Sequence, residues 1–163
     1  MIEVQIDDAR WVGFEALASR AADAVFDAVG LDRDVWLVSV LACDDARIQV
    51  LNADFREKDG ATNVLSWPAQ DLAAVGAGDK PDAPVPDPMG ESELGDVAIS
   101  FDTCAREAAE AACDFDDHVA HLMIHGTLHL LGYDHIRDAD ATLMETLEVQ
   151  ILGKLGLCDP YTV

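Results

Sequence analysis

Residues 1–7 begin the chain with apolar side chains at every second position, separated by polar ones. This two-residue period puts the apolar side chains on one face of an extended chain and predicts a half-buried strand. Three later apolar runs also have the length of a strand and contain β-branched residues. They are residues 36–42 (WLVSVLA), 61–67 (ATNVLSW) and 94–100 (LGDVAIS). The pattern therefore predicts four strands.

Between and after these strands, apolar residues recur three or four positions apart, which is the period of a helix with one buried face. Aspartates that can cap a helix precede several of these stretches, and Gly30 and Gly132 follow two of them. The five predicted helices cover residues 14–29, 45–55, 102–113, 115–131 and 138–155. This order predicts an α/β (α+β) fold. We expect a single compact domain over residues 1–163, with a small mixed four-stranded sheet packed against about five helices.

Residues 69–92 interrupt the regular pattern. The segment is rich in Gly, Pro, Ala and Asp, contains no aromatic residue and has Lys80 as its single basic residue. Such a composition buries too little apolar surface to fix the backbone. We predict a mobile surface loop between the third and fourth strands.

Composition limits the possible locations of the protein. Half of the 163 residues are apolar, which suffices for one core. Nothing approaches the run of about 18 uncharged apolar residues that a membrane helix needs, and the first residues lack the layout of a secretory signal. The cysteines form no CxxC pair, so buried thiols in a reducing compartment are expected. They are Cys43, Cys104, Cys113 and Cys158. These features indicate a cytoplasmic protein that does not act on membranes.

The net charge of −22 changes the expected partners, because only ten residues are Lys or Arg. Non-specific affinity for nucleic acids comes from basic side chains that neutralise phosphates. Indiscriminate binding of nucleic acids is therefore not expected, and a phosphate-bearing substrate has to meet a local basic spot or a metal ion. We interpret the acidity itself as an adaptation for solubility or salt.

The histidines carry the strongest chemical signal. All five fall within 18 residues, and three of them form the pattern HxxxHxxGxxH over residues 125–135. His125 and His129 are one helical turn apart, so both imidazoles point toward one spot. Gly132 lets the chain reverse and present His135. Three imidazole ligands leave the fourth position of a tetrahedral zinc ion to water, as in catalytic sites. We predict a metal site at the end of this helix, in the C-terminal half of the chain.

The residues around this motif have simpler interpretations. His118 is interpreted as an ordinary polar residue of the helix. His121 is either a fourth ligand or a neighbour outside the ligand set, and the second interpretation is favoured because a fourth ligand from the same helix would strain the tetrahedron. Asp134 either orients a ligand imidazole or bonds the backbone of its own turn. Met144 has the spacing of a core residue.

Gly126 distinguishes the motif from that of zinc peptidases. Those enzymes carry a Glu directly after the first His and use it as the general base. A metzincin-like zinc peptidase is therefore disfavoured, although a bound metal ion still lowers the pKa of its water without that Glu.

HGTLHLLGYDH, residues 125–135, closely resembles the signature of the YbeY family of rRNA maturation factors and metal-dependent endoribonucleases. Three other stretches resemble family blocks: Leu51 to Asp59, TNVLSWP at 62–68, and LGDVAIS at 94–100. Trp67 stands where the family usually has Phe. The likeness covers most of the chain outside residues 69–92.

The resemblance implies a metal-dependent endoribonuclease that acts on single-stranded RNA, in 16S rRNA 3′-end maturation and ribosome quality control. It implies one divalent ion, with Zn²⁺ preferred, on His125, His129 and His135. Arg56 is implied as the catalytic arginine, and Lys58 and Asp96 are candidate substrate contacts. The expected partners are rRNA in the small ribosomal subunit and a ribosomal or GTPase assembly protein, not DNA. The alternative is a ribosome-assembly binding factor whose metal is structural.

Overall fold

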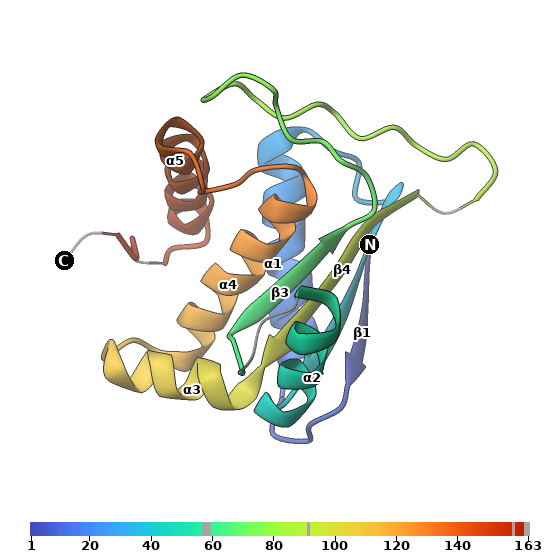
Figure 1. Ribbon diagram of the computed structural model, residues 1–163. Helices are drawn as coiled ribbons and strands as arrows, with labels where there is room; N and C mark the ends of the chain where they lie inside the picture. Colours follow the sequence, from blue (N-terminus) through green and yellow to red (C-terminus); the bar gives the residue numbers. More distant parts are fainter. Residues whose placement is uncertain (57–59, 91, 158, 162–163) are drawn as a thin grey trace.

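The computed structural model describes residues 1–56, 60–90, 92–157 and 159–161, and the side chain of Arg56 is not part of that description. The described residues form helices and strands in the predicted order (Figure 1). The elements are β1 (Ile2–Ile6), α1 (Phe14–Val29), β2 (Trp36–Cys43), α2 (Asp45–Arg56), β3 (Val64–Pro68), β4 (Ser92–Ser100), α3 (Phe101–Glu110), α4 (Phe115–Leu130) and α5 (Asp138–Lys154).

The strands form one mixed sheet in the order β1-β2-β4-β3. The pairs β1–β2 and β2–β4 are parallel, and β3 runs antiparallel to β4 at one edge. The α+β architecture with a mixed four-stranded sheet is therefore confirmed for the described residues. None of the helices in the described ranges combines the length and apolar character needed to cross a bilayer.

Two layers of helices cover the sheet. α1, α4 and α5 contribute to the larger core on one face, and α2 lies on the opposite face over a smaller core (Figure 1). The alternating strand pattern explains this division, because successive side chains of a strand point to opposite faces. Each fully buried Leu, Ile or Phe contributes about 1.5–3 kcal/mol to the free energy of folding, so the larger core fixes where α4 lies on the sheet.

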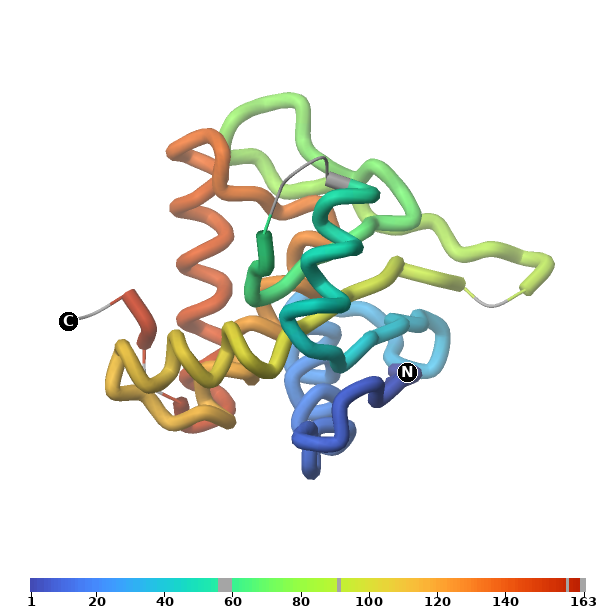
Figure 2. The backbone as a smooth tube through the Cα atoms, turned by 60° about the horizontal axis from the view of Figure 1, so that its bottom comes forward, coloured from blue at the N-terminus to red at the C-terminus, as the bar shows by residue number. Residues whose placement is uncertain are grey.

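Residues 69–90 connect β3 to β4 and are tied to the helical layer over their first half. The Leu72 side chain is buried, and the guanidinium of Arg137 donates to two backbone carbonyls of the segment, each at 2.9 Å. The N–H of Gly78 donates to the Asp140 carboxylate at 2.8 Å. Both views show this segment beside the connection between α4 and α5 (Figures 1 and 2). The mobility predicted for the loop stays a prediction.

The cysteines differ from the expectation in one respect. Cys43 and Cys104 are buried, whereas Cys113 is exposed, so the expectation of buried thiols is wrong for Cys113. The physical reason is local, because α3 ends at Glu110 and leaves Cys113 in the turn before α4. Cys158 lies outside the described residues. Burial raises the pKa of the Cys43 thiol to about 12 and also raises the pKa of Cys104.

We predict that Cys43 and Cys104 resist alkylation in the native protein. The thiolate is the reactive form, and burial both disfavours it and excludes the reagent. Peptide mass mapping after a pulse of iodoacetamide at pH 8 is expected to find both residues unmodified, and fully modified when guanidinium is present. Native modification of either one at the rate of the unfolded chain would contradict the described core.

Candidate metal centre

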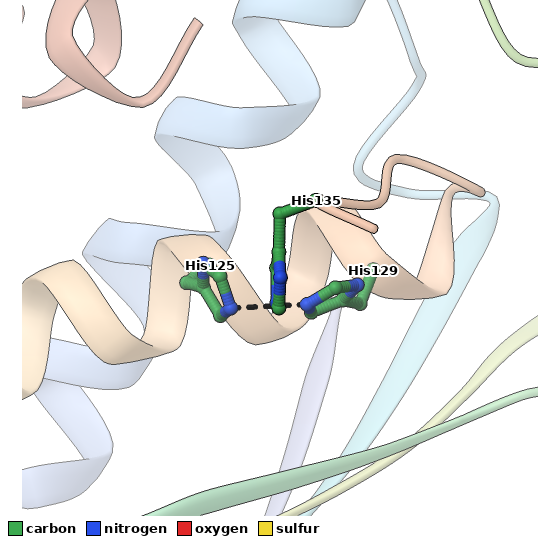
Figure 3. A group of neighbouring side chains, drawn as sticks. All are labelled: His125, His129 and His135. Carbon is green, nitrogen blue, oxygen red and sulfur yellow. Dashed lines mark hydrogen bonds between the residues drawn. The ribbon is translucent and has the colours of Figure 1, made fainter. Parts of the chain in front are cut away.

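His125 and His129 lie one turn apart on α4. The helix begins at a favourable cap, since the Asp114 carboxylate accepts the N–H groups of Asp116 at 2.9 Å and Asp117 at 3.2 Å. The two histidine side chains are partly buried, and their Nε2 atoms are 3.0 Å apart (Figure 3). The sequence spacing therefore produces the convergence that it predicts.

The end of α4 reverses the chain through a Schellman motif. The N–H of Tyr133 donates to the carbonyl of Leu128 at 3.1 Å, and the N–H of Gly132 donates to that of His129 at 3.0 Å. Gly132 has a φ of 98°, a left-handed conformation that other residues rarely adopt. A Cβ at this position would also lie 2.7 Å from the carbonyl carbon of Leu72. Both the turn and its packing against the β3–β4 connection require glycine.

The reversal brings His135 back to the helix. Its ring centroid lies 5.3 Å from that of His125 and 5.0 Å from that of His129. One ring nitrogen from each of the three histidines lies within 4.8 Å of the others. Figure 3 shows the exposed His135 ring from the turn reaching between the two helix histidines.

The hydrogen-bonding partners of the Nδ1 atoms determine which nitrogen of each ring carries the proton. His129 Nδ1 lies 2.9 Å from the carbonyl oxygen of Tyr133, and His125 Nδ1 lies 2.6 Å from Oε1 of Glu148. A carbonyl and an ionised carboxylate only accept hydrogen bonds, so both Nδ1 atoms carry the proton. When both rings are neutral, the two Nε2 atoms therefore direct lone pairs at each other.

Two lone pairs at 3.0 Å repel unless a proton or a cation lies between them. A tetrahedral zinc ion with bonds of about 2.0–2.1 Å separates its ligand nitrogens by about 3.3 Å. The imidazole donor set and its spacing therefore fit a divalent ion of this size.

The protonation state of His129 also suits metal binding. Burial, followed by the neighbouring His125 and His135, lowers its pKa to about 4, although the hydrogen bond to the Tyr133 carbonyl and the charge of Asp134 act in the opposite direction. The ring is therefore neutral at pH 7, which is the form that coordinates metals.

Glu148 on α5 is a site residue that the sequence interpretation missed. Its side chain is fully buried, and its Oε2 lies 3.0 Å from Nε2 of His121 and accepts the hydroxyl of Tyr161. Burial raises the pKa of this carboxyl, but hydrogen bonds from His121, His125 and Tyr161 outweigh burial and bring the pKa to about 2. A sequence signal existed, because Glu148 falls in the buried helical series between Met144 and Ile151.

The other residues near the motif lie as follows. The Asp134 carboxylate accepts the backbone N–H of His135 at 2.7 Å, which fits the turn interpretation. His118 pairs with Glu107 of α3 at 3.0 Å, away from the three-histidine group. Met144 is buried in the larger core.

The histidines lie in a groove of about 900 Å³ whose other wall is the continuous segment 62–73, including β3. Asp96 lines a different groove of about 960 Å³ on the α2 side of the sheet, opposite Trp67 in the β3–β4 register. Trp67 lines both grooves, so they adjoin there. The structure therefore does not bring Asp96 to the histidines.

The two basic residues that the sequence predicts for the site, Arg56 and Lys58, are described only in part or not at all. Arg56 is the last residue of α2, and its side chain is not described. Lys58 lies outside the described residues. Their roles stay predictions.

Gly126 faces the sheet and not the groove. A Cβ there would lie 3.2 Å from Oγ of Ser66 and 3.4 Å from methyl carbons of Val64 and Val97. The Ser66 hydroxyl also donates to the Gly126 carbonyl at 3.1 Å. α4 therefore approaches β3 closely here, and any side chain at this position would begin in tight contact with the strand. The general base of the zinc peptidases is absent, because this residue is glycine.

The chain is similar to known proteins over its whole length. The sequence profile of the family described as "Endoribonuclease YbeY" matches residues 2–156. Proteins of that name from Ruegeria sp. (strain TM1040) and Ruegeria pomeroyi are 58% and 57% identical, and the matches cover 100% and 99% of this chain and 97% and 98% of theirs. The solution structure of TM1509 from Thermotoga maritima matches with a TM-score of 0.57 at 21% identity, covering 100% of both chains. That structural likeness supports the fold.

We predict that Gly126→Ala destabilises the protein by about 1–3 kcal/mol, because the added methyl group overpacks the contact between α4 and β3. Gly153→Ala on α5 is the matched control. A Cβ there meets nothing within 4 Å, so we expect a gain of about 0.5–1 kcal/mol. Urea unfolding of metal-free protein measures both. Equal effects of the two substitutions would contradict the close packing at Gly126.

Proposed function

The chain belongs to the YbeY endoribonuclease family, and from that premise we propose that it cleaves single-stranded RNA in the groove containing His125, His129 and His135. The observation that carries the proposal is the pair of Nε2 lone pairs held 3.0 Å apart beside a third imidazole. A divalent ion bound by these nitrogens would remove their repulsion, and it supplies the Lewis acidity and low water pKa that phosphodiester hydrolysis uses.

We assign one divalent ion per chain to the three histidines, with Zn²⁺ preferred. Neutral imidazoles in a tetrahedral arrangement are typical zinc ligands, although Ni and Cu also bind such sites and metal availability decides. The chain holds two of the rings by hydrogen bonds to their Nδ1 atoms, so these rings need little reorganisation to bind the ion.

The groove suits an unpaired strand of RNA. Its wall is formed by the edge strand β3. The Trp67 ring lies on the α2 side of that strand, with its centroid 5.9 Å from that of Phe55, so a base of single-stranded RNA would stack on it only where the two grooves adjoin. The described lining of the groove at the histidines contains no Lys or Arg. Positive charge for a phosphate must therefore come from the bound ion and from residues beyond that lining.

Arg56 is our candidate for that charge. It is the last residue of α2, and the chain reaches the groove wall six residues later, at Thr62. A guanidinium in this place would donate two hydrogen bonds to phosphate oxygens and stabilise the negative charge of the transition state. Lys58 would add to the same positive spot, and Asp96 would contact RNA only where the two grooves adjoin.

The substrate we propose is the 3′ end of 16S rRNA within the small ribosomal subunit, in the cytoplasm. The net charge of −22 supports docking on an assembled particle, or through a ribosomal or GTPase assembly protein, over a search along free RNA.

We predict that His129→Ala abolishes metal binding. Wild-type protein purified without added ions should contain one equivalent of zinc per chain by elemental analysis. Zinc at one hundred times its dissociation constant should then stabilise the wild type by about 2.7 kcal/mol. His118→Ala on the same helix is the control and should behave as the wild type. Zinc retention by His129→Ala would refute the assignment.

We predict that Arg56→Ala lowers single-turnover cleavage of a labelled single-stranded RNA by roughly 10²- to 10³-fold, the usual cost of losing a donor to transition-state charge. Zinc content should not change. Arg33→Ala, which removes an exposed arginine paired with Asp27 at 2.8 Å, is the control. Full activity of a folded Arg56→Ala protein would count against its catalytic role. Wild-type protein that binds RNA without cutting it would favour the assembly-factor alternative.

A further inference from the structure

We propose that Glu148 is a positioning residue for the metal centre, which holds His125 in its binding orientation and is itself held by His121 and Tyr161. The inference rests on the proposed function, because it takes the three histidines as the metal site. It makes α5 and Tyr161 part of that site.

The Glu148 carboxylate is a charged group on the otherwise apolar buried face of α5. Glu148 is fully buried on the inward face of α5, between the buried side chains of Met144 and Ile151. A buried charge is unfavourable unless it is paired, and apolar side chains in place of the whole buried pair are often at least as stable. The helix interface by itself therefore gives no reason for a carboxylate here.

The two carboxylate oxygens are both fully used. Oε1 accepts from His125 Nδ1 at 2.6 Å, while Oε2 lies 3.0 Å from His121 Nε2 and accepts the Tyr161 hydroxyl. His121 and Tyr161 also contact each other edge to face, with centroids 5.8 Å apart. These contacts fix the position of the carboxylate before any ligand binds.

For His125, the contact with Glu148 fixes the orientation of the ring and leaves Nε2 as the atom that can bind a metal. With its proton held on Nδ1 by Glu148, the ring directs the Nε2 lone pair toward His129. His129 is held similarly by the Tyr133 carbonyl. A carboxylate is the stronger acceptor, so it increases the basicity of the ligand ring more than a carbonyl does. Its negative charge also offsets part of the charge of a divalent ion.

A second metal site is the competing interpretation. His121, His125 and Glu148 also offer three ligand atoms within 4.8 Å of one another. A metal ion there would have to take Nδ1 of His125 and replace the hydrogen bonds that join Glu148 to His121 and His125. It would also sit beside a fully buried carboxylate, away from the groove. We therefore assign this group to positioning and expect one metal ion per chain.

The test measures two quantities for each variant. One is the zinc affinity, from competition with a chromogenic chelator, and the other is the stability of the metal-free protein. Glu148→Gln is expected to weaken zinc binding about 10- to 100-fold, as loss of such orienting partners does. Glu148→Met is expected to lose zinc affinity to a similar degree and also to lower the stability of the metal-free protein, because His121, His125 and Tyr161 lose their acceptor. Glu148→Gln keeps the size of the side chain, so a purely structural role would weaken zinc binding in Glu148→Met and not in Glu148→Gln.

Two further variants complete the design. Tyr161→Phe removes one donor to the carboxylate without touching a ligand and should weaken zinc binding less than Glu148→Gln. Glu107→Gln is the matched control. Glu107 of α3 makes the same kind of contact, at 3.0 Å, to His118, which lies on α4 as His125 does. It should bind zinc as the wild type does.

The outcomes separate the two proposals. A wild-type protein that binds no zinc, or a His129→Ala protein that binds it normally, overturns the proposed function. Normal zinc affinity in Glu148→Gln and Glu148→Met, with zinc lost in His129→Ala, overturns the positioning role alone. Two zinc ions per wild-type chain and one per Glu148→Gln chain would establish the second site and also overturn it. A selective loss of affinity in the Glu148 variants supports the proposal.

Discussion

The repulsion between two imidazole lone pairs is the constraint on which the site depends. Neutral histidines separate their acceptor nitrogens when they are free to rotate, yet His125 and His129 hold theirs 3.0 Å apart. The Tyr133 carbonyl and the Glu148 carboxylate impose this by binding the opposite edge of each ring. The glycine turn that places the carbonyl and the helix packing that places the carboxylate are therefore both required to maintain a geometry that favours a cation.

Local patterns in the sequence were enough to predict much of this fold. The element order and the mixed sheet follow from two-residue and helical periods, which depend only on neighbours along the chain. The three-histidine group was also predictable, because a helical turn and a glycine reversal connect its members within eleven residues, 125–135. The structure brings these three rings together as the spacing predicts.

What the sequence did not reveal depends on contacts between distant segments. Glu148 looks like one more acidic residue in an acidic chain until α5 packs against α4. Gly126 is notable in the sequence only for the glutamate it replaces, whereas the structure shows that it lies in close contact with β3. Asp96 lies on the strand that a family block identifies, but strand alternation directs it to the groove on the other face of the sheet.

Strand β3 and the residues on either side of it contact the helices at three points. Near its start, the Asn63 amide donates to Glu107 of α3 at 3.0 Å; in the middle, Ser66 bonds Gly126; beyond its end, Leu72 lies against Gly132. These contacts hold the strand side of the groove against the helices, so packing fixes the position of the wall that faces the histidines. For the RNA cleavage proposed above, such a wall would sort substrates by steric fit before any base is recognised. Selection of this kind would need little of the positive charge that is scarce in this acidic chain.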